Sequence, residues 1–138
     1  MTVTPQIRRS AAEQQRLESL LQEMFEHRIS FNEVLGLKVT SFAPAAPQLK
    51  FAMRPELVGH YLYGRLHGGV IAAALDTVGG FAAVVGIAEK FCGETAEQVA
   101  HRFGRIVRLG GRIASIQMTL ENESGLLIAT GSAAYVVS

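Results

Sequence analysis

The chain has 138 residues, 49% of them hydrophobic, which fits one domain with a substantial apolar core. Its 13 basic and 12 acidic residues give a net charge of +1, so no overall field favours nucleic acid or an anionic membrane. A single cysteine, Cys92, excludes an intrachain disulfide and a cysteine-based zinc cluster, and it is typical of a reducing compartment. The first residues lack the continuous apolar stretch of a secretory signal. We therefore expect one cytoplasmic domain spanning residues 1–138.

The N-terminal segment, residues 1–35, is predicted to be helical. Apolar residues recur at helical spacing between Leu17 and Phe25, with polar residues on the opposite face, which predicts an amphipathic helix. The sequence from Ser30 to Glu33 fits a capping box, and Gly36 can end the short helix that follows. In that short helix we expect three apolar side chains to pack inward: Phe31, Val34 and Leu35.

Two strands are predicted next, because apolar residues alternate in residues 37–39 and 49–53. Pro44 and Pro47 lie in the connection, so the pair is expected to form a hairpin with one buried face. Residues 55–66 are predicted to be a loop rich in aromatic residues, which either line a tunnel or pack against the sheet.

Residues 68–88 predict a long helix in which Asp76 is the only ionisable side chain. Because this helix is apolar on every face, we expect other elements to surround it. An ionised aspartate without a partner in such an interior would cost several kcal/mol, so Asp76 should be paired, wetted by a cleft or used chemically. The helix has about the length of a membrane span, but Asp76 near its middle and several glycines argue against that interpretation.

The start of this helix offers backbone donors. Gly68 and Gly69 leave their N–H groups open to a ligand at the positive end of the helix dipole, which suits an oxyanion. Gly69 and Asp76 are seven residues apart and therefore share a helix face, but they are separated by about 10.5 Å along the axis. One reacting carbon cannot touch both. Two antiparallel copies could place Asp76 of one beside Gly69 of the other, so we predict an obligate homodimer, or a dimer of dimers, with composite sites.

Two further hairpins are predicted after the helix. Gly110 and Gly111 form a plausible turn between residues 105–109 and 112–121. Residues 122–125 then turn the chain into a last strand over 126–137. The fold class expected from these elements is α+β, with helices packed on an antiparallel sheet.

The segment from Leu66 to Gly80, LHGGVIAAALDTVGG, resembles the signature of hot-dog-fold acyl-CoA thioesterases, in the branch similar to phenylacetyl-CoA thioesterase. The resemblance implies a long central helix wrapped by an antiparallel sheet, and hydrolysis of acyl-CoA without a metal or a separate cofactor. It further implies that the Gly69 amide polarises the thioester carbonyl, that His67 shapes the helix start, and that Asp76 from the partner subunit activates water or attacks the acyl carbon. The residues of the helix and the other residues that could line an acyl tunnel are mainly aliphatic, which favours medium or long acyl chains over aromatic acyl groups.

Two features depart from the family pattern. An asparagine usually lies six or seven residues before the motif histidine, where this chain has Tyr61 and His60. His60 either replaces that amide near the thioester or is a loop residue at the mouth of the site. Relatives also usually carry another strand between the central helix and the last hairpins, and this chain lacks roughly a strand and its turn. A deletion, an incomplete sequence record, or a strand recruited from residues 94–103 would each explain the difference.

Candidate contacts for the CoA portion of the substrate are Gly68 and three arginines: Arg65, Arg108 and Arg112. For the arginines, a solvated position at a strand end is the commoner role. Two other functions stay open. One is a hot-dog protein that binds acyl-CoA or an acyl carrier without turnover. The other is a dehydratase, which ranks third because His67 and Asp76 project to opposite helix faces.

Overall fold

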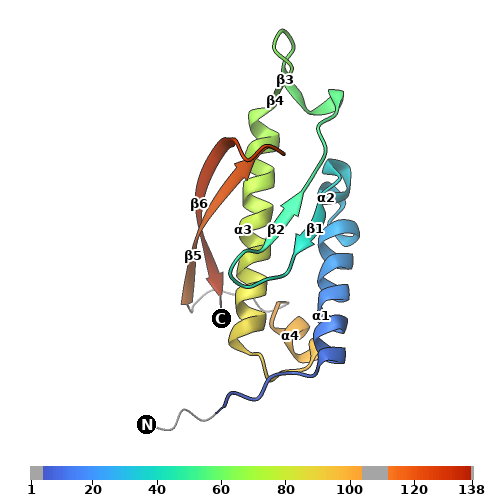
Figure 1. Cartoon of the computed structure of the whole chain (residues 1–138), viewed down its shortest axis with the longest axis vertical. Helices are drawn as coiled ribbons and strands as arrows, with labels where there is room; N and C mark the ends of the chain where they lie inside the picture. The colour runs from blue at the N-terminus through green and yellow to red at the C-terminus, as the bar shows by residue number, and fades with distance from the viewer. Residues whose placement is uncertain (1–4, 104–111, 138) are drawn as a thin grey trace.

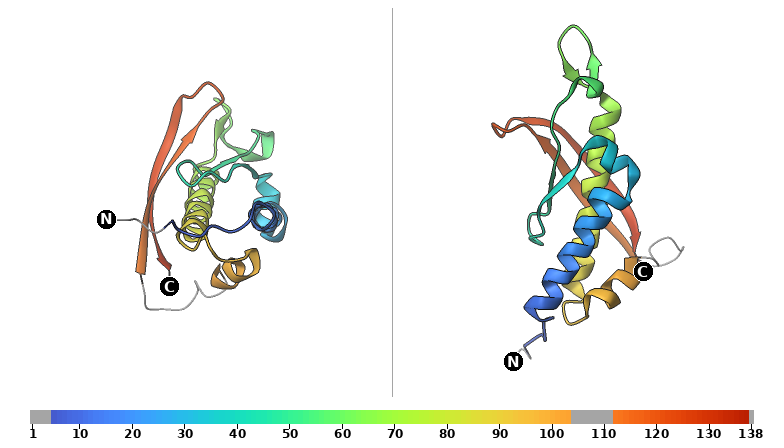
Figure 2. Two further views of the ribbon diagram at one scale, coloured as in Figure 1. Left: turned by 60° about the horizontal axis from the view of Figure 1, so that its bottom comes forward. Right: turned by 90° about the vertical axis from the view of Figure 1, so that its right-hand side faces the viewer.

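The computed structural model describes residues 5–103 and 112–137 and is built around one long helix, α3 (Gly68–Lys90) (Figure 1). The strands β5 (Arg112–Glu121) and β6 (Leu127–Val137) lie along one side of α3, and the helix α1 (Ala11–Glu23) lies along the other. Figure 2 shows this order when the molecule is viewed nearly along α3. The predicted α+β class is confirmed.

The N-terminal helical segment forms, but its second part differs from the prediction. The Ser10 hydroxyl caps α1, which continues into a π-helical turn, η1 (Met24–Arg28), and then α2 (Ser30–Leu35). Gly36 ends α2 in the left-handed conformation, with φ of 71°, as predicted. The capping box does not form, because Ile29 occupies the N-cap position of α2.

The prediction that Phe31 and Val34 pack inward is wrong, since 56% and 63% of their surfaces are exposed. Leu35 is buried as expected, and beside it the polar Asn32 is almost completely buried. The reason is a hydrogen bond: the Asn32 side-chain amide donates to the carbonyl of Phe25 in the π-helical turn, at 3.0 Å. At this position Asn32, and not Phe31, faces the interior.

The predicted first hairpin is confirmed by antiparallel pairing of β1 (Lys38–Ser41) and β2 (Gln48–Lys50). The segment predicted as a loop contains a short 3₁₀ turn, η2 (Pro55–Leu57), and a small hairpin of β3 (Val58–His60) and β4 (Arg65–Leu66). This small hairpin projects beyond the start of α3 (Figure 1).

The last hairpin also follows the prediction. Strands β5 and β6 pair antiparallel from Arg112 opposite Val137 to Glu121 opposite Leu127. Asn122 organises the turn, because its side-chain oxygen accepts hydrogen bonds from the backbone N–H groups of Ser124 and Leu126. The hairpin predicted around Gly110 and Gly111 lies outside the described residues.

The suggestion that residues 94–103 supply a strand is wrong, because they contain the helix α4 (Ala96–Phe103). Thr95 and Gln98 form a reciprocal capping box at its start: each backbone N–H donates to the other side chain. Ala96 and Val99, one helical turn apart, are fully buried. The capping pair and the helical spacing of the buried residues together favour a helix here.

Two apolar clusters hold the elements together. The larger joins α1, α3 and α4 around Phe81, whose side chain is completely buried and makes edge contacts with Phe25 and Phe42. The smaller contains Leu35, Leu37 and Leu57 and supports the first turns of α3. Length and composition alone would let α3 cross a membrane, but a core helix has the same properties. Here the other elements pack along α3.

The far end of α3 is fixed by charged side chains. Arg9 donates to the carbonyls of Ala88 and Phe91, at 2.7 and 3.0 Å, and so caps the helix C-terminus. Nearby, Arg102 donates to Glu94 at 2.7 Å and holds the pKa of that carboxyl below its usual value. The predicted functional residues lie at the opposite end of α3.

Candidate active site

The start of α3 is held by His67, which is the N-cap residue. Its imidazole Nδ1 accepts a hydrogen bond from the Gly69 N–H at 2.8 Å, and the backbone N–H of His67 donates to the Leu57 carbonyl at 2.8 Å. Val70 and Ile71 donate to the His67 carbonyl. The Gly69 amide, predicted to polarise the thioester carbonyl, is therefore bonded to His67 in this structure. A substrate carbonyl oxygen can replace Nδ1 as the acceptor of the Gly69 N–H only when the imidazole moves away.

Gly59 lies against this helix start. A Cβ atom added to Gly59 would lie 2.6 Å from the Cα of His67, which is closer than real contacts of this kind. Gly69 is restricted in a similar way, because an added Cβ would lie 2.9 Å from His67 Nδ1. Both glycines are therefore needed for the observed position of His67.

His60 and Arg65 lie on the small hairpin next to the helix start. The His60 ring lies 4.7 Å from the Tyr63 ring and 6.0 Å from the Tyr61 ring, and the Arg65 guanidinium lies 5.3 Å from the Tyr63 ring. The two tyrosines are 85% and 69% exposed, so they form an aromatic tip and do not pack against the sheet. The structure thus brings His60, Arg65, His67 and the two glycines 68–69 to one end of the molecule.

Asp76 lies about two turns further along α3, and it is exposed in the single chain. The expectation of a carboxylate enclosed in an apolar interior is wrong for one copy, because the sheet and α1 pack on other faces of α3. Gly69, Ala72 and Asp76 form an exposed face, named here the Asp76 face. The shared face predicted from their spacing is therefore present.

The remaining predicted contacts do not join this group within one chain. Arg112 begins β5 opposite Val137, near the end of α3 that is remote from Gly68 (Figure 1). Arg108 lies outside the described residues. Within residues 5–103 and 112–137, no three His, Cys, Asp or Glu side chains are grouped so that they could hold a metal ion.

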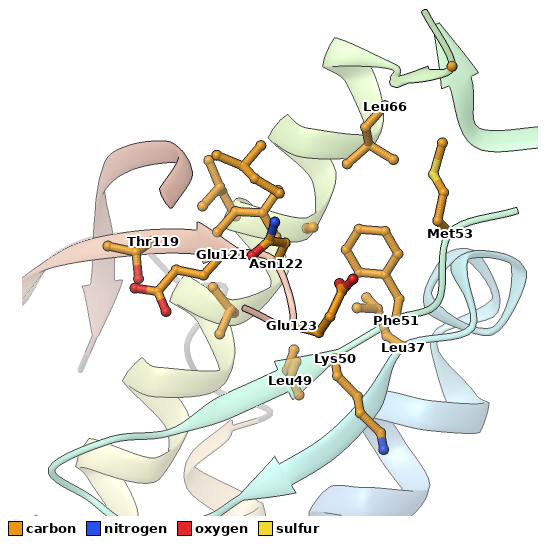
Figure 3. A pocket seen from close by; sticks show the side chains of 16 residues that line it. Leu37, Leu49, Lys50, Phe51, Met53, Leu66, Thr119, Glu121, Asn122 and Glu123 are labelled. Carbon is orange, nitrogen blue, oxygen red and sulfur yellow. The ribbon is translucent and has the colours of Figure 1, made fainter. Parts of the chain in front are cut away.

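Sequence reasoning missed a pocket on another face of α3 (Figure 3). It has a volume of about 610 Å³ and lies between α3, the β2 segment and the turn joining β5 to β6. On α3 it contacts Ala74, Leu75 and Val78, which point away from the Asp76 face. The helical spacing of these three residues predicts that they share one face of α3. The opposite wall of the pocket comes from segments distant in sequence, so spacing along the chain does not predict the pocket.

A long central helix with antiparallel hairpins defines a hot-dog-fold protein, and solved structures support this class. A Shewanella oneidensis protein related to the thioesterase superfamily matches 94% of this chain and all of its own chain, with a TM-score of 0.80 and 27% identity. A candidate thioesterase from Syntrophus aciditrophicus matches 93% of this chain and all of its own, with a TM-score of 0.75 and 33% identity.

Curated relatives give the family. The medium/long-chain acyl-CoA thioesterase YigI of Salmonella typhimurium is 30% identical over 142 positions, covering 86% of this chain and 92% of the relative. YigI of Escherichia coli is 28% identical with the same coverage. No family model matches the chain. The chain belongs to the thioesterase family that these proteins represent.

The alignment with the Salmonella protein extends over 142 positions but uses only 86% of a chain of 138 residues. The Salmonella protein therefore has residues without a counterpart in this chain.

Proposed function

We propose that this protein hydrolyses medium- and long-chain acyl-CoA to free fatty acid and CoA. The observation that carries the proposal is the Asp76 face, an exposed helix face that carries a helix-start residue, Gly69, and a carboxylate about 10.5 Å further along the axis. The names of the curated relatives support the same substrate class. We also propose that the His67–Gly68–Gly69 segment works as in the phenylacetyl-CoA thioesterase branch. This part of the proposal assigns roles to the catalytic residues and does not imply a phenylacetyl substrate.

In the proposed mechanism, the Gly69 N–H donates to the thioester carbonyl oxygen and stabilises the negative charge that develops there. His67 releases this N–H when the substrate arrives. Asp76 takes a proton from water as the water oxygen bonds to the acyl carbon, and the C–S bond then breaks. The thiolate leaves as CoA and receives a proton. In the alternative route, the Asp76 carboxylate attacks the acyl carbon, the C–S bond breaks, and the CoA thiolate leaves and is protonated. Water then hydrolyses the resulting anhydride, which releases the fatty acid and restores the Asp76 carboxylate.

Both routes need Asp76 from a second copy, because Gly69 and Asp76 of one helix are about 10.5 Å apart along the axis. We therefore include a homodimer in the proposal, with the Asp76 faces in contact. No metal or separate cofactor takes part, and CoA enters as part of the substrate. Contacts from Gly68, Arg65, Arg108 and Arg112 to CoA, a role for His60 at the mouth of the site, and a cytoplasmic location belong to the same proposal.

The test is thiol release from acyl-CoAs of graded chain length by the purified protein and its Asp76→Asn variant. We expect the variant to lose at least about 100- to 1,000-fold in turnover, comparable with the loss of an oxyanion donor. Glu33→Gln, which neutralises an exposed acid on α2, should keep the parental rate. Equal rates for Asp76→Asn and the parent would reject the assignment. Acyl-CoA binding without thiol release would instead favour a non-catalytic binding protein.

A further inference from the structure

A buried polar contact joins α2 to α3 beside Asp76. Asn32 of α2 is only 2% exposed, and its side-chain amide donates to the Phe25 carbonyl at 3.0 Å. The Asn32 side-chain oxygen lies 3.5 Å from the Thr77 hydroxyl of α3, which also donates to the Ala73 carbonyl at 2.8 Å. A buried polar link restricts two elements to one relative arrangement, because other arrangements leave polar atoms without partners. The contact therefore fixes which side of α3 faces α2.

Apolar packing restrains α3 less at this level than at either side of it. The smaller apolar cluster contacts Ala73, and the completely buried Phe81 holds the helix about one turn further on. Between these anchors, residues 72–80 include three alanines and two glycines, whose short side chains interlock little with neighbouring elements. The pocket of about 610 Å³ lies against the same stretch, so packing on that side is incomplete. The Asn32–Thr77 contact thus adds a directional restraint where apolar packing adds little.

Rotation of α3 about its axis would displace the Asp76 carboxylate. Adjacent residues of an α-helix point about 100° apart, so a Thr77 side chain fixed towards α2 also fixes the direction of Asp76. A side chain at the helix surface lies about 5–6 Å from the axis, so a rotation of about 10° moves it by about 1 Å. A misplacement of about 1 Å can cost about a hundredfold in rate. A small rotation of α3 would therefore affect catalysis before it affects the fold.

We propose that Thr77, held by Asn32, is a positioning residue that sets the place of the Asp76 carboxylate in the shared active site. This inference rests on the proposed acyl-CoA hydrolysis and adds a residue to it. Thr77 acts through the rotation of α3 and does not contact the substrate. Its loss should therefore lower kcat and leave KM unchanged, because the position of the carboxylate matters in the transition state and not for substrate binding.

The first test measures kcat and KM for dodecanoyl-CoA in the parent, Thr77→Val and Thr77→Ser. Valine has the shape of threonine without the hydroxyl, so kcat should fall about tenfold while KM stays within about twofold of the parental value. Serine keeps the hydroxyl, so its kcat should stay within about twofold of the parental value. Parental kcat in Thr77→Val, or an equally low kcat in Thr77→Ser, would overturn the inference.

Two control variants separate positioning from the general effects of substitution. Thr40→Val makes the same chemical change at an exposed position of β1. Val99→Ala truncates a fully buried side chain of α4 in the larger apolar cluster, and so lowers stability away from the proposed site. Both variants should keep the parental kcat. A kcat in Val99→Ala as low as that of Thr77→Val would attribute the loss to stability alone and contradict the positioning role.

The second test asks whether Asn32 and Thr77 act through one contact. If they do, Asn32→Ala, Thr77→Val and the double variant should each lose about tenfold in kcat, whereas independent effects would multiply to about a hundredfold in the double variant. The multiplied loss would overturn the link between the two residues. A parent that releases no thiol would reject the proposed hydrolysis, and the positioning role with it. An active parent, an inactive Asp76→Asn and an unaffected Thr77→Val would reject the positioning role alone.

Discussion

Gly59 has a structural role at the helix start because no side chain fits between it and His67. The obstructing atom is the backbone Cα of His67, which, unlike the end of a flexible side chain, cannot rotate away. The position of the His67 ring, and with it the Gly69 amide, therefore depends on a glycine in the neighbouring strand β3. Backbone contact across the β3–β4 hairpin thus sets the geometry of the proposed oxyanion site.

We predict that Gly59→Ala lowers the free energy of unfolding by about 1–3 kcal/mol, because the added methyl group forces the backbones apart. Displacement of the helix start should also lower kcat/KM for acyl-CoA by about tenfold to a hundredfold. Denaturant unfolding and thiol release measure the two effects. The control is Gly86→Ala in α3, where the added methyl group has no atom within 4 Å. Alanine favours a helix over glycine, so this variant should raise the free energy of unfolding by about 0.5–1 kcal/mol and keep the parental activity. A Gly59→Ala protein as stable and active as the parent would show that the contact is unimportant.

Single residues also show what the sequence could and could not predict about the site. The spacing of Gly69 and Asp76 was sufficient to place both on one helix face, because helical geometry is local. The hydrogen bond from Gly69 to His67 was not anticipated, since either water or a substrate could equally satisfy the amide. The exposure of Asp76 was also mispredicted: an apolar helix sequence indicates burial but does not say whether the same chain or a second copy provides the cover.

At the scale of elements, the junction of η1 and α2 depends on one buried amide. Asn32 donates to Phe25 inside the π-helical turn, and the Thr77 hydroxyl of α3 lies 3.5 Å from the Asn32 side-chain oxygen. Thr77 is adjacent to Asp76 in sequence, so this contact ties α2 to the part of α3 that carries the carboxylate. The π-helical turn and its buried polar partner are tertiary features, and the periodicity of the apolar residues does not encode them.

We expect Asn32→Ala to lower the free energy of unfolding by about 1–3 kcal/mol, because the buried carbonyl of Phe25 loses its hydrogen-bond donor. The neighbouring exposed substitution Glu33→Ala should change stability by no more than about 0.5 kcal/mol. Urea unfolding followed by circular dichroism provides both values. If Asn32→Ala and Glu33→Ala were equally mild, the amide would not organise this junction.

Elements differ in how well the sequence predicted them. The hairpins β1–β2 and β5–β6 were recognisable because apolar alternation and turn residues act over short distances. The helix α4 was not predicted, although Thr95 and Gln98 provide a capping box, because the family pattern has a strand after the central helix. Local capping chemistry was the better guide to residues 95–103.

For the whole molecule, the arrangement leaves the Asp76 face uncovered. The first turns of α3 extend beyond α1 (Figure 1), and the sheet and the pocket occupy other faces of the helix. A second copy packed antiparallel on this face would cover the exposed residues and bring each Asp76 to the opposite Gly69. A twofold axis would then generate two equivalent sites, each built from both copies.

Mixed dimers can test this shared site directly. Asp76→Asn removes the carboxylate, and Gly69→Pro removes the amide hydrogen and displaces the His67 ring, since an added Cβ would lie 2.9 Å from His67 Nδ1. We expect each variant alone to be nearly inactive. When equal amounts are unfolded together and refolded, half of the dimers should be mixed, and each mixed dimer should contain one intact site formed by Gly69 of one copy and Asp76 of the other. Activity should then recover to about a quarter of the parental value. No recovery, despite mixed dimers detected by native mass spectrometry, would mean that each active site is built from a single chain.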